Sequence, residues 1–197
     1  MNWATFGKAF VTLLVVMDPI GTAPVFLALT REQSHTTARR AALVASLAAL
    51  GIVLVFALFG QVVLAYLHVS MASLSIAGGL LLALVALEML QDQTAPPTHG
   101  EGVALVPLAT PLLAGPGAIA TVMVLVRQHP GFSAHLGVYL AILATVVVIG
   151  LVFLLAAQLQ RLIRPAALLF LTRIFGFLLT AIAVQLVVDG ATVLARG

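Results

Sequence analysis

Long apolar stretches separated by short polar segments dominate the pattern of this 197-residue chain. Each stretch has about the length needed to cross the roughly 30 Å hydrocarbon core of a bilayer. Six of them occur, over residues 5–30, 40–67, 70–91, 103–127, 135–160 and 166–194. The pattern therefore predicts an all-α membrane protein with six transmembrane spans.

The composition supports the same class. Apolar residues make up 62% of the chain and charged residues only 8%, against roughly 25% charged in a typical soluble domain. The basic residues behind the formal charge of +3 are scattered singly or at span ends, which favours a lipid bilayer as partner and not nucleic acid. With no cysteine, disulfides and thiolate metal sites are excluded. No motif indicates an enzyme, a cofactor or a metal site.

The chain also shows an internal repeat. A constant shift of 97 residues superposes Pro19 on Pro116, Gln61 on Gln158 and Gly79 on Gly176. We therefore divide one membrane domain into a first three-helix repeat (1–91), a polar connecting loop (92–102) and a second three-helix repeat (103–197). Because each repeat has an odd number of spans, the two must lie inverted relative to each other, as in many secondary transporters.

Basic residues in the predicted loops set the expected orientation. One side holds five and the other three: Arg31, Arg39, Arg40, Arg161 and Arg164 against Lys8, Arg127 and Arg196. Since cytoplasmic loops carry the excess of Lys and Arg, we expect both termini on the non-cytoplasmic side.

Proline and glycine interrupt the first and fourth spans at matching positions. In Asp18-Pro19 and Gly115-Pro116, a favoured N-cap precedes a proline, which is favoured at the first helical position. Spans 1 and 4 are therefore predicted to break at mid-membrane, with a second half-helix starting at each proline. Such breaks are the best sequence pointer to a substrate site in a repeat-built transporter.

The chemistry of two helix starts suggests the substrate. Their unpaired N–H groups and partial positive charge favour a carboxylate. Carbonyls just before each break are suited to an ammonium group, so a small zwitterion fits best. The predicted substrate-binding residues are Asp18, Pro19, Gly21, Thr22, Thr110, Gly115, Pro116, Gly117 and Ala118.

Three polar residues are candidates for coupling or gating: Asp18, Glu88 and Gln185. Each has a simpler explanation. Asp18 is suited to capping a half-helix, although an intramembrane carboxylate is a functional hypothesis by default. Glu88 lies at a span end, where solvation at the cytoplasmic edge is favoured, and Gln185 is suited to hydrogen bonding between helices.

The interrupted segments also carry a family resemblance. Asp18–Pro24 and Pro111–Ala118 resemble the two signature motifs of the MarC family, and Ile76–Gly79 and Gln185–Gly190 are similar to that family too. Thr22 departs from the pattern, because many members carry Asn there. The resemblance implies a six-span protein of the cell inner membrane and transport of small neutral amino acids such as glycine or alanine.

These observations predict a secondary transporter that moves a small neutral amino acid by alternating access, coupled to a proton or Na⁺ gradient. Two alternatives stay open. Facing half-helices also build passive channels for small polar solutes, and a membrane scaffold subunit without transport is the second alternative. The amino acid, the direction of transport and the oligomeric state are not specified by the sequence.

Overall fold

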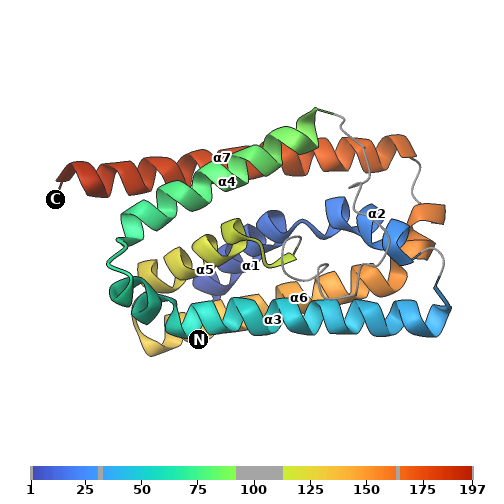
Figure 1. The fold of residues 1–197 in the computed structure, drawn as a ribbon, viewed down its shortest axis with the longest axis horizontal. Coiled ribbons are helices and arrows are strands. Elements are labelled where there is room, and N and C mark those ends of the chain that lie inside the picture. Colours follow the sequence, from blue (N-terminus) through green and yellow to red (C-terminus); the bar gives the residue numbers. More distant parts are fainter. Residues whose placement is uncertain (1, 31–32, 92–112, 163–164, 197) are drawn as a thin grey trace.

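The computed structural model describes residues 2–30, 33–91, 113–162 and 165–196, and these form seven helices (Figure 1). The helices are α1 (Trp3–Met17), α2 (Pro19–Thr30), α3 (His35–Tyr66), α4 (Met71–Leu90), α5 (Pro116–Gln128), α6 (Phe132–Leu162) and α7 (Pro165–Arg196). The prediction of an all-α fold is thus confirmed for the described residues.

Among the described residues, five helical stretches are long and apolar enough to cross a membrane: Trp3–Leu27, His35–Tyr66, Met71–Leu90, Phe132–Ala156 and Leu169–Arg196. The predicted fourth span corresponds to the shorter apolar helix α5. Its first part, residues 103–112, lies outside the described residues, as does the predicted connecting loop 92–102.

Short polar side chains define several helix starts. Asn2 accepts a hydrogen bond from the Thr5 N–H (3.2 Å), and Ser70 accepts one from the Ser73 N–H (3.0 Å). Ser34 caps α3 in the same way. Because this cap precedes the basic residues Arg39 and Arg40, α3 begins at His35, more than a turn before the apolar span predicted from residue 40.

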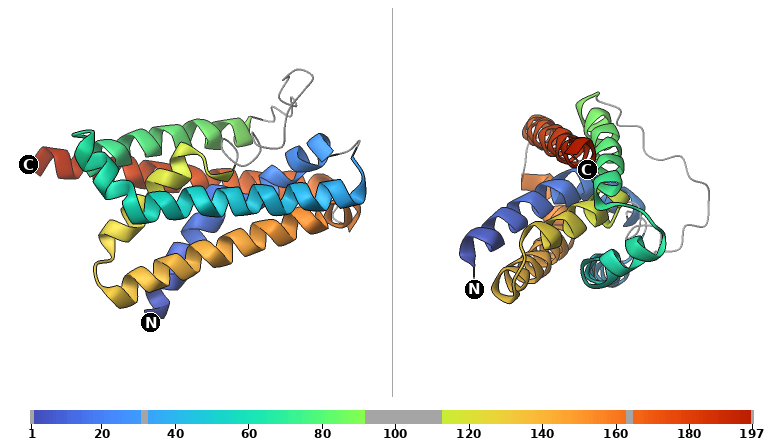
Figure 2. Two further views of the ribbon diagram at one scale, coloured as in Figure 1. Left: turned by 60° about the horizontal axis from the view of Figure 1, so that its bottom comes forward. Right: turned by 90° about the vertical axis from the view of Figure 1, so that its left-hand side faces the viewer.

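The helices are arranged in two pairs with shorter helices between them. α4 packs along α7, and α3 packs along α6, while α1, α2 and α5 lie between these pairs (Figures 1 and 2). α1 and α2 contact α6, and α5 contacts α3 and α4. Within each pair the helices run antiparallel, and both chain ends lie towards the same end of the long axis (Figure 1).

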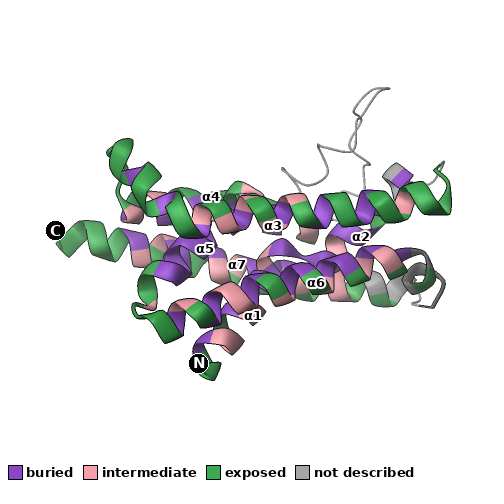
Figure 3. Cartoon of the chain, turned by 90° about the horizontal axis from the view of Figure 1, so that it is seen from below, coloured by how far each residue is buried: buried purple, intermediate pink, exposed green. Residues whose placement is uncertain are grey.

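The core is built mainly from small and aliphatic side chains, and two buried aromatic rings stack within it. The rings of Phe26 and Phe153 lie 4.5 Å apart, at an interplanar angle of 4°. Buried residues face the interior of the bundle, whereas exposed positions face outwards (Figure 3). Many of the exposed side chains are large and apolar, among them Leu47, Val62 and Phe177. Such an apolar outer surface is suited to contact with lipid. The backbone N–H and C=O groups of a spanning helix are hydrogen-bonded within the helix itself.

Candidate functional site

Asp18 separates α1 from α2. Its backbone adopts a left-handed conformation (φ 37°, ψ 73°), and its N–H donates to the Leu14 carbonyl (3.1 Å). This conformation ends a helix, and Asp tolerates it better than most residues because of its short polar side chain. The chain therefore leaves the path of α1 at Asp18, and the fixed φ of Pro19 suits the first position of the next helix.

The side chain of Asp18 caps the helix that it precedes. Its Oδ1 accepts a hydrogen bond from the Gly21 N–H (3.0 Å). The backbone carbonyl of Asp18 accepts a second hydrogen bond, from the Thr22 hydroxyl (2.8 Å). Asp18 is only 7% exposed and Thr22 only 8%. A buried carboxylate is thus held at the start of α2, where the helix dipole favours negative charge.

The cap formed by Asp18 explains why position 21 is a glycine. A Cβ there would collide with the Asp18 carboxylate. An alanine at this position would push the carboxylate away from the N–H groups that it caps. Gly21 therefore serves the geometry of Asp18, and its role as a substrate contact stays a prediction.

The second helix start differs in having no charged side chain. Gly115 is the N-cap of α5 without a side-chain hydrogen bond, and Pro116 follows at the first helical position. A Cβ on Gly117 would collide with the Leu82 side chain of α4. Gly117 and Ala118 are buried, Gly115 is half-buried and Pro116 is exposed.

Both helix starts contribute to one buried core. Met17 and Ala23, which flank the first start, belong to the same hydrophobic cluster as Leu113, Ala114 and Ala118 around the second. α1 also contacts α5 directly. Thr110, which was predicted to lie beside the second break, is outside the described residues.

The other predicted polar residues lie on the outer helices. Glu88 is exposed near the end of α4. Gln185 is exposed on α7, and its Nε2 donates to Asp189 Oδ1 at 2.6 Å. This hydrogen bond lies within α7, because Asp189 is one turn along the same helix, and a hydrogen bond from Gln185 to another helix stays a prediction.

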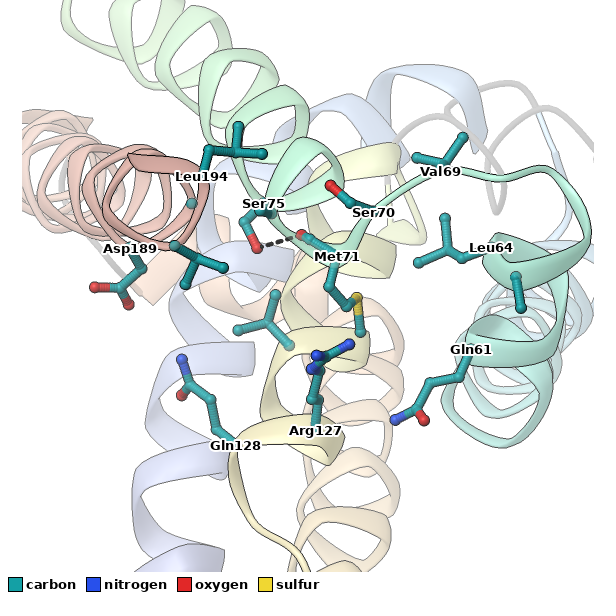
Figure 4. A pocket seen from close by; sticks show the side chains of 15 residues that line it. Gln61, Leu64, Val69, Ser70, Met71, Ser75, Arg127, Gln128, Asp189 and Leu194 are labelled. Carbon is teal, nitrogen blue, oxygen red and sulfur yellow. Dashed lines mark hydrogen bonds between the residues drawn. The ribbon is translucent and has the colours of Figure 1, made fainter. Parts of the chain in front are cut away.

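The sequence interpretation did not identify a pocket at one end of the bundle, whose largely apolar walls carry several polar side chains. The pocket has a volume of about 570 Å³ and is formed by the end of α3, the start of α4, the end of α5 and the last turns of α7 (Figure 4). Its polar lining consists of Gln61, Ser70, Ser75, Arg127, Gln128 and Asp189. None of the predicted substrate-binding residues lines it.

The sequence contains the polar residues of this pocket, but they are far from one another along the chain. Gln61 is a polar residue inside a predicted span, and Asp189 belongs to the segment Gln185–Gly190. Arg127 was counted among the loop residues at the end of the fourth predicted span, and the structure places it in the last turn of α5. Only the packing of four separate helices brings these residues to one cavity.

The helix lengths, the apolar outer surface and the buried interior define an integral membrane protein of the α-helical class. A family model described as "MarC family integral membrane protein" matches residues 3–195. The chain therefore belongs to the MarC family, and the resemblance of its motifs is confirmed.

Several curated relatives are similar over nearly their whole length. A UPF0056 membrane protein, MJ1677, of Methanocaldococcus jannaschii is 36% identical over 96% of this chain and 97% of its own. A UPF0056 membrane protein of Aquifex aeolicus is 34% identical over 94% and 91%. The UPF0056 inner membrane protein YhgN of Escherichia coli K12 is 33% identical over 96% and 98%. No solved structure matches the chain.

Proposed function

We propose that this protein is a secondary transporter of small neutral amino acids in the cell inner membrane. The observation that carries the proposal is the interruption at Asp18, where a buried carboxylate ends one helix and caps the next. Backbone groups freed inside a membrane cost several kcal/mol each unless protein or a water-filled cavity satisfies them. An interruption at membrane depth therefore favours a substrate site over a purely structural role.

An inverted repeat is the second part of the proposal. A Cβ on Gly79 would lie 2.7 Å from the Ala183 carbonyl, and a Cβ on Gly176 would lie 3.5 Å from the Ala86 carbonyl. The shift of 97 residues that relates Gly79 to Gly176 also relates Ala86 to Ala183. The two contacts are therefore reciprocal, as expected at a pseudo-twofold axis between α4 and α7.

The helix contacts support the same symmetry. The shift of 97 residues carries α2 onto α5, α3 onto α6 and α4 onto α7, whereas the counterpart of α1 lies mostly outside the described residues. The contact of α2 with α6 then corresponds to that of α5 with α3. The antiparallel course of α3 and α6, and of α4 and α7, is what inversion requires (Figure 1).

The substrate class follows from the two helix starts. The N–H groups at the starts of α2 and α5 are suited to a carboxylate. Asp18 and the carbonyls that precede each start are suited to an ammonium group. The small side chain of Ala118 beside the second helix start favours a ligand of the size of glycine or alanine. The name of the relative YhgN, an inner membrane protein, supports the proposed location.

Uptake of labelled glycine and alanine by liposomes that contain the purified protein tests the proposal. We expect saturable uptake that collapses when an uncoupler or an ionophore removes the proton or Na⁺ gradient. Asp18→Asn should abolish this uptake while the helix cap persists, because Asn caps as well as Asp. Arg39→Gln, which changes an exposed arginine near the start of α3, is the matched control and should retain uptake.

Two other outcomes would replace the proposal. Flux that ignores ion gradients and does not saturate would indicate a passive channel, which facing helix starts also build. Absence of flux, together with a partner that co-purifies in fixed ratio, would indicate a scaffold. Thiol labelling of cysteines introduced near each terminus, by a reagent that does not cross the membrane, tests the expected non-cytoplasmic location of both ends.

A further inference from the structure

The pocket at the end of the bundle is separate from the helix starts around Asp18 and Pro116. Its walls come from α3, α4, α5 and α7. Its volume of about 570 Å³ lies in the range of small-molecule sites in proteins. Under the orientation expected from the basic residues, this end of the bundle faces the non-cytoplasmic side.

Arg127 provides the positive charge of the pocket. Its guanidinium rises from the last turn of α5 towards the start of α4, with Gln61 on one side and Gln128 on the other (Figure 4). The two amides add neutral donors beside the charge. The first residues of α4, Met71 and Ala72, also line the pocket, and the N–H groups of a first helical turn lack partners within the helix.

Asp189 provides a negative charge on the α7 wall. It accepts a hydrogen bond from Gln185 (2.6 Å), and its carboxylate is directed away from Arg127 (Figure 4). The guanidinium is therefore left available to a ligand. The two charges together give the pocket no net formal charge, so it matches a ligand that is itself neutral overall but carries a carboxylate. A dianion such as phosphate would be repelled by Asp189.

We propose that this pocket is an outer binding site, where Arg127 holds the carboxylate of a small zwitterionic solute before it reaches the centre of the protein. The proposal rests on the proposed transport function for the identity of the solute. Gln61 and Gln128 orient the carboxylate beside the guanidinium. A charge-assisted, two-pronged contact of this kind is the geometry that arginine favours with carboxylates.

A single introduced cysteine can report on occupancy, because the chain contains no cysteine. Val193 lines the pocket and is 61% exposed, so Val193→Cys adds a thiol without removing a polar group. The labelling rate of this thiol by a charged methanethiosulfonate reagent is measured in nanodiscs of phosphatidylcholine and phosphatidylglycerol. The probes are glycine and alanine, with acetate, methylamine and inorganic phosphate for comparison.

We expect glycine and alanine to slow labelling in a saturable manner, and phosphate to leave it unchanged. Arg127→Gln, added to Val193→Cys, should raise the half-protecting concentration by about tenfold or more, since a hydrogen bond between charged groups is lost. Arg39→Gln is the control and should leave that concentration unchanged. Asp18→Asn should also leave the protection intact, because it alters the central site and not the pocket.

Three results would overturn the proposal. Glycine and alanine could fail to slow labelling at any concentration. Protection could survive Arg127→Gln but disappear with Asp18→Asn, which would place the ligand at the central site and shield the thiol only indirectly. Protection could also arise without any added solute when phosphatidylethanolamine is present, which would assign the pocket to a lipid headgroup. Labelling requires no transport, so its failure and the failure of the uptake assay are distinguishable.

Discussion

Replacing Gly79 by alanine tests the close approach of α4 and α7. A Cβ at this position would lie 2.7 Å from the carbonyl oxygen of Ala183 and 2.8 Å from Cγ2 of Val187. Both distances are shorter than van der Waals contact. The Ala183 carbonyl belongs to the backbone of α7 and cannot rotate away, so the two helices must move apart.

The size of the effect follows from two opposing contributions. Inserting a methyl group into a packed interface costs about 1–3 kcal/mol. Replacing glycine by alanine inside a helix gains up to about 1 kcal/mol. Gly51 separates these contributions, because it also lies within a long helix but a Cβ there would have no neighbour within 4 Å. The difference between Gly79→Ala and Gly51→Ala should therefore be about 1–3 kcal/mol.

Thermal unfolding of the detergent-solubilised protein, followed by size-exclusion chromatography of the heated samples, measures this difference. We expect Gly79→Ala to lower the midpoint and Gly51→Ala to leave it unchanged or raise it. Gly176→Ala should have a smaller effect than Gly79→Ala, because its Cβ would lie 3.1 Å from the Met89 Cβ. Equal midpoints for the Gly79 and Gly51 variants would refute the close contact.

Three further substitutions test other parts of the structure. Asp18→Ala should lower the free energy of unfolding by about 1 kcal/mol through loss of a helix cap, whereas Asp18→Asn should leave it nearly unchanged in the same thermal assay. Phe153→Ala should cost about 3–5 kcal/mol because it removes the stack on Phe26; a midpoint equal to that of the parent protein would contradict this. Thr121 has a buried hydroxyl with no hydrogen-bond partner, so Thr121→Val should stabilise the protein by about 1 kcal/mol. Thr145→Val is the matched control and should not stabilise, since that hydroxyl donates to the Ala141 carbonyl at 2.8 Å.

Local chemistry allowed the helix starts at Pro19 and Pro116 to be predicted from sequence. In each case a residue with good capping geometry precedes a proline, and both signals act within one turn. The capping role of Asp18 was predicted for the same reason. Hydropathy also located the long helices, but it missed the polar first turn of α3, which begins at His35 and not at residue 40.

The pocket around Arg127 could not be predicted in this way. Its residues come from four helices that are distant in sequence, so no local pattern joins Gln61 to Asp189. Basic residues at span ends are usually explained by membrane topology or by contact with lipid headgroups. Because that explanation also accounts for Arg127, its place in a pocket was not predicted. The hydrogen bond from Gln185 to Asp189 follows the spacing of one helical turn, and it could have been proposed from the sequence segment that contains both residues.

The packing around the two helix starts has a consequence for the proposed transport. α1 and α2 pack on α6, and α5 packs on α3 and α4. Under the proposed inverted repeat, each helix start lies against long helices of the other repeat, so a movement of one repeat changes the surroundings of the helix start in the other. The reciprocal glycine contacts hold α4 and α7 closely together, so we expect rocking to occur about this pair. A disulfide between cysteines introduced at Ala86 and Gly176 should then leave glycine uptake largely intact, and strong inhibition by that disulfide would place the movement at this interface instead.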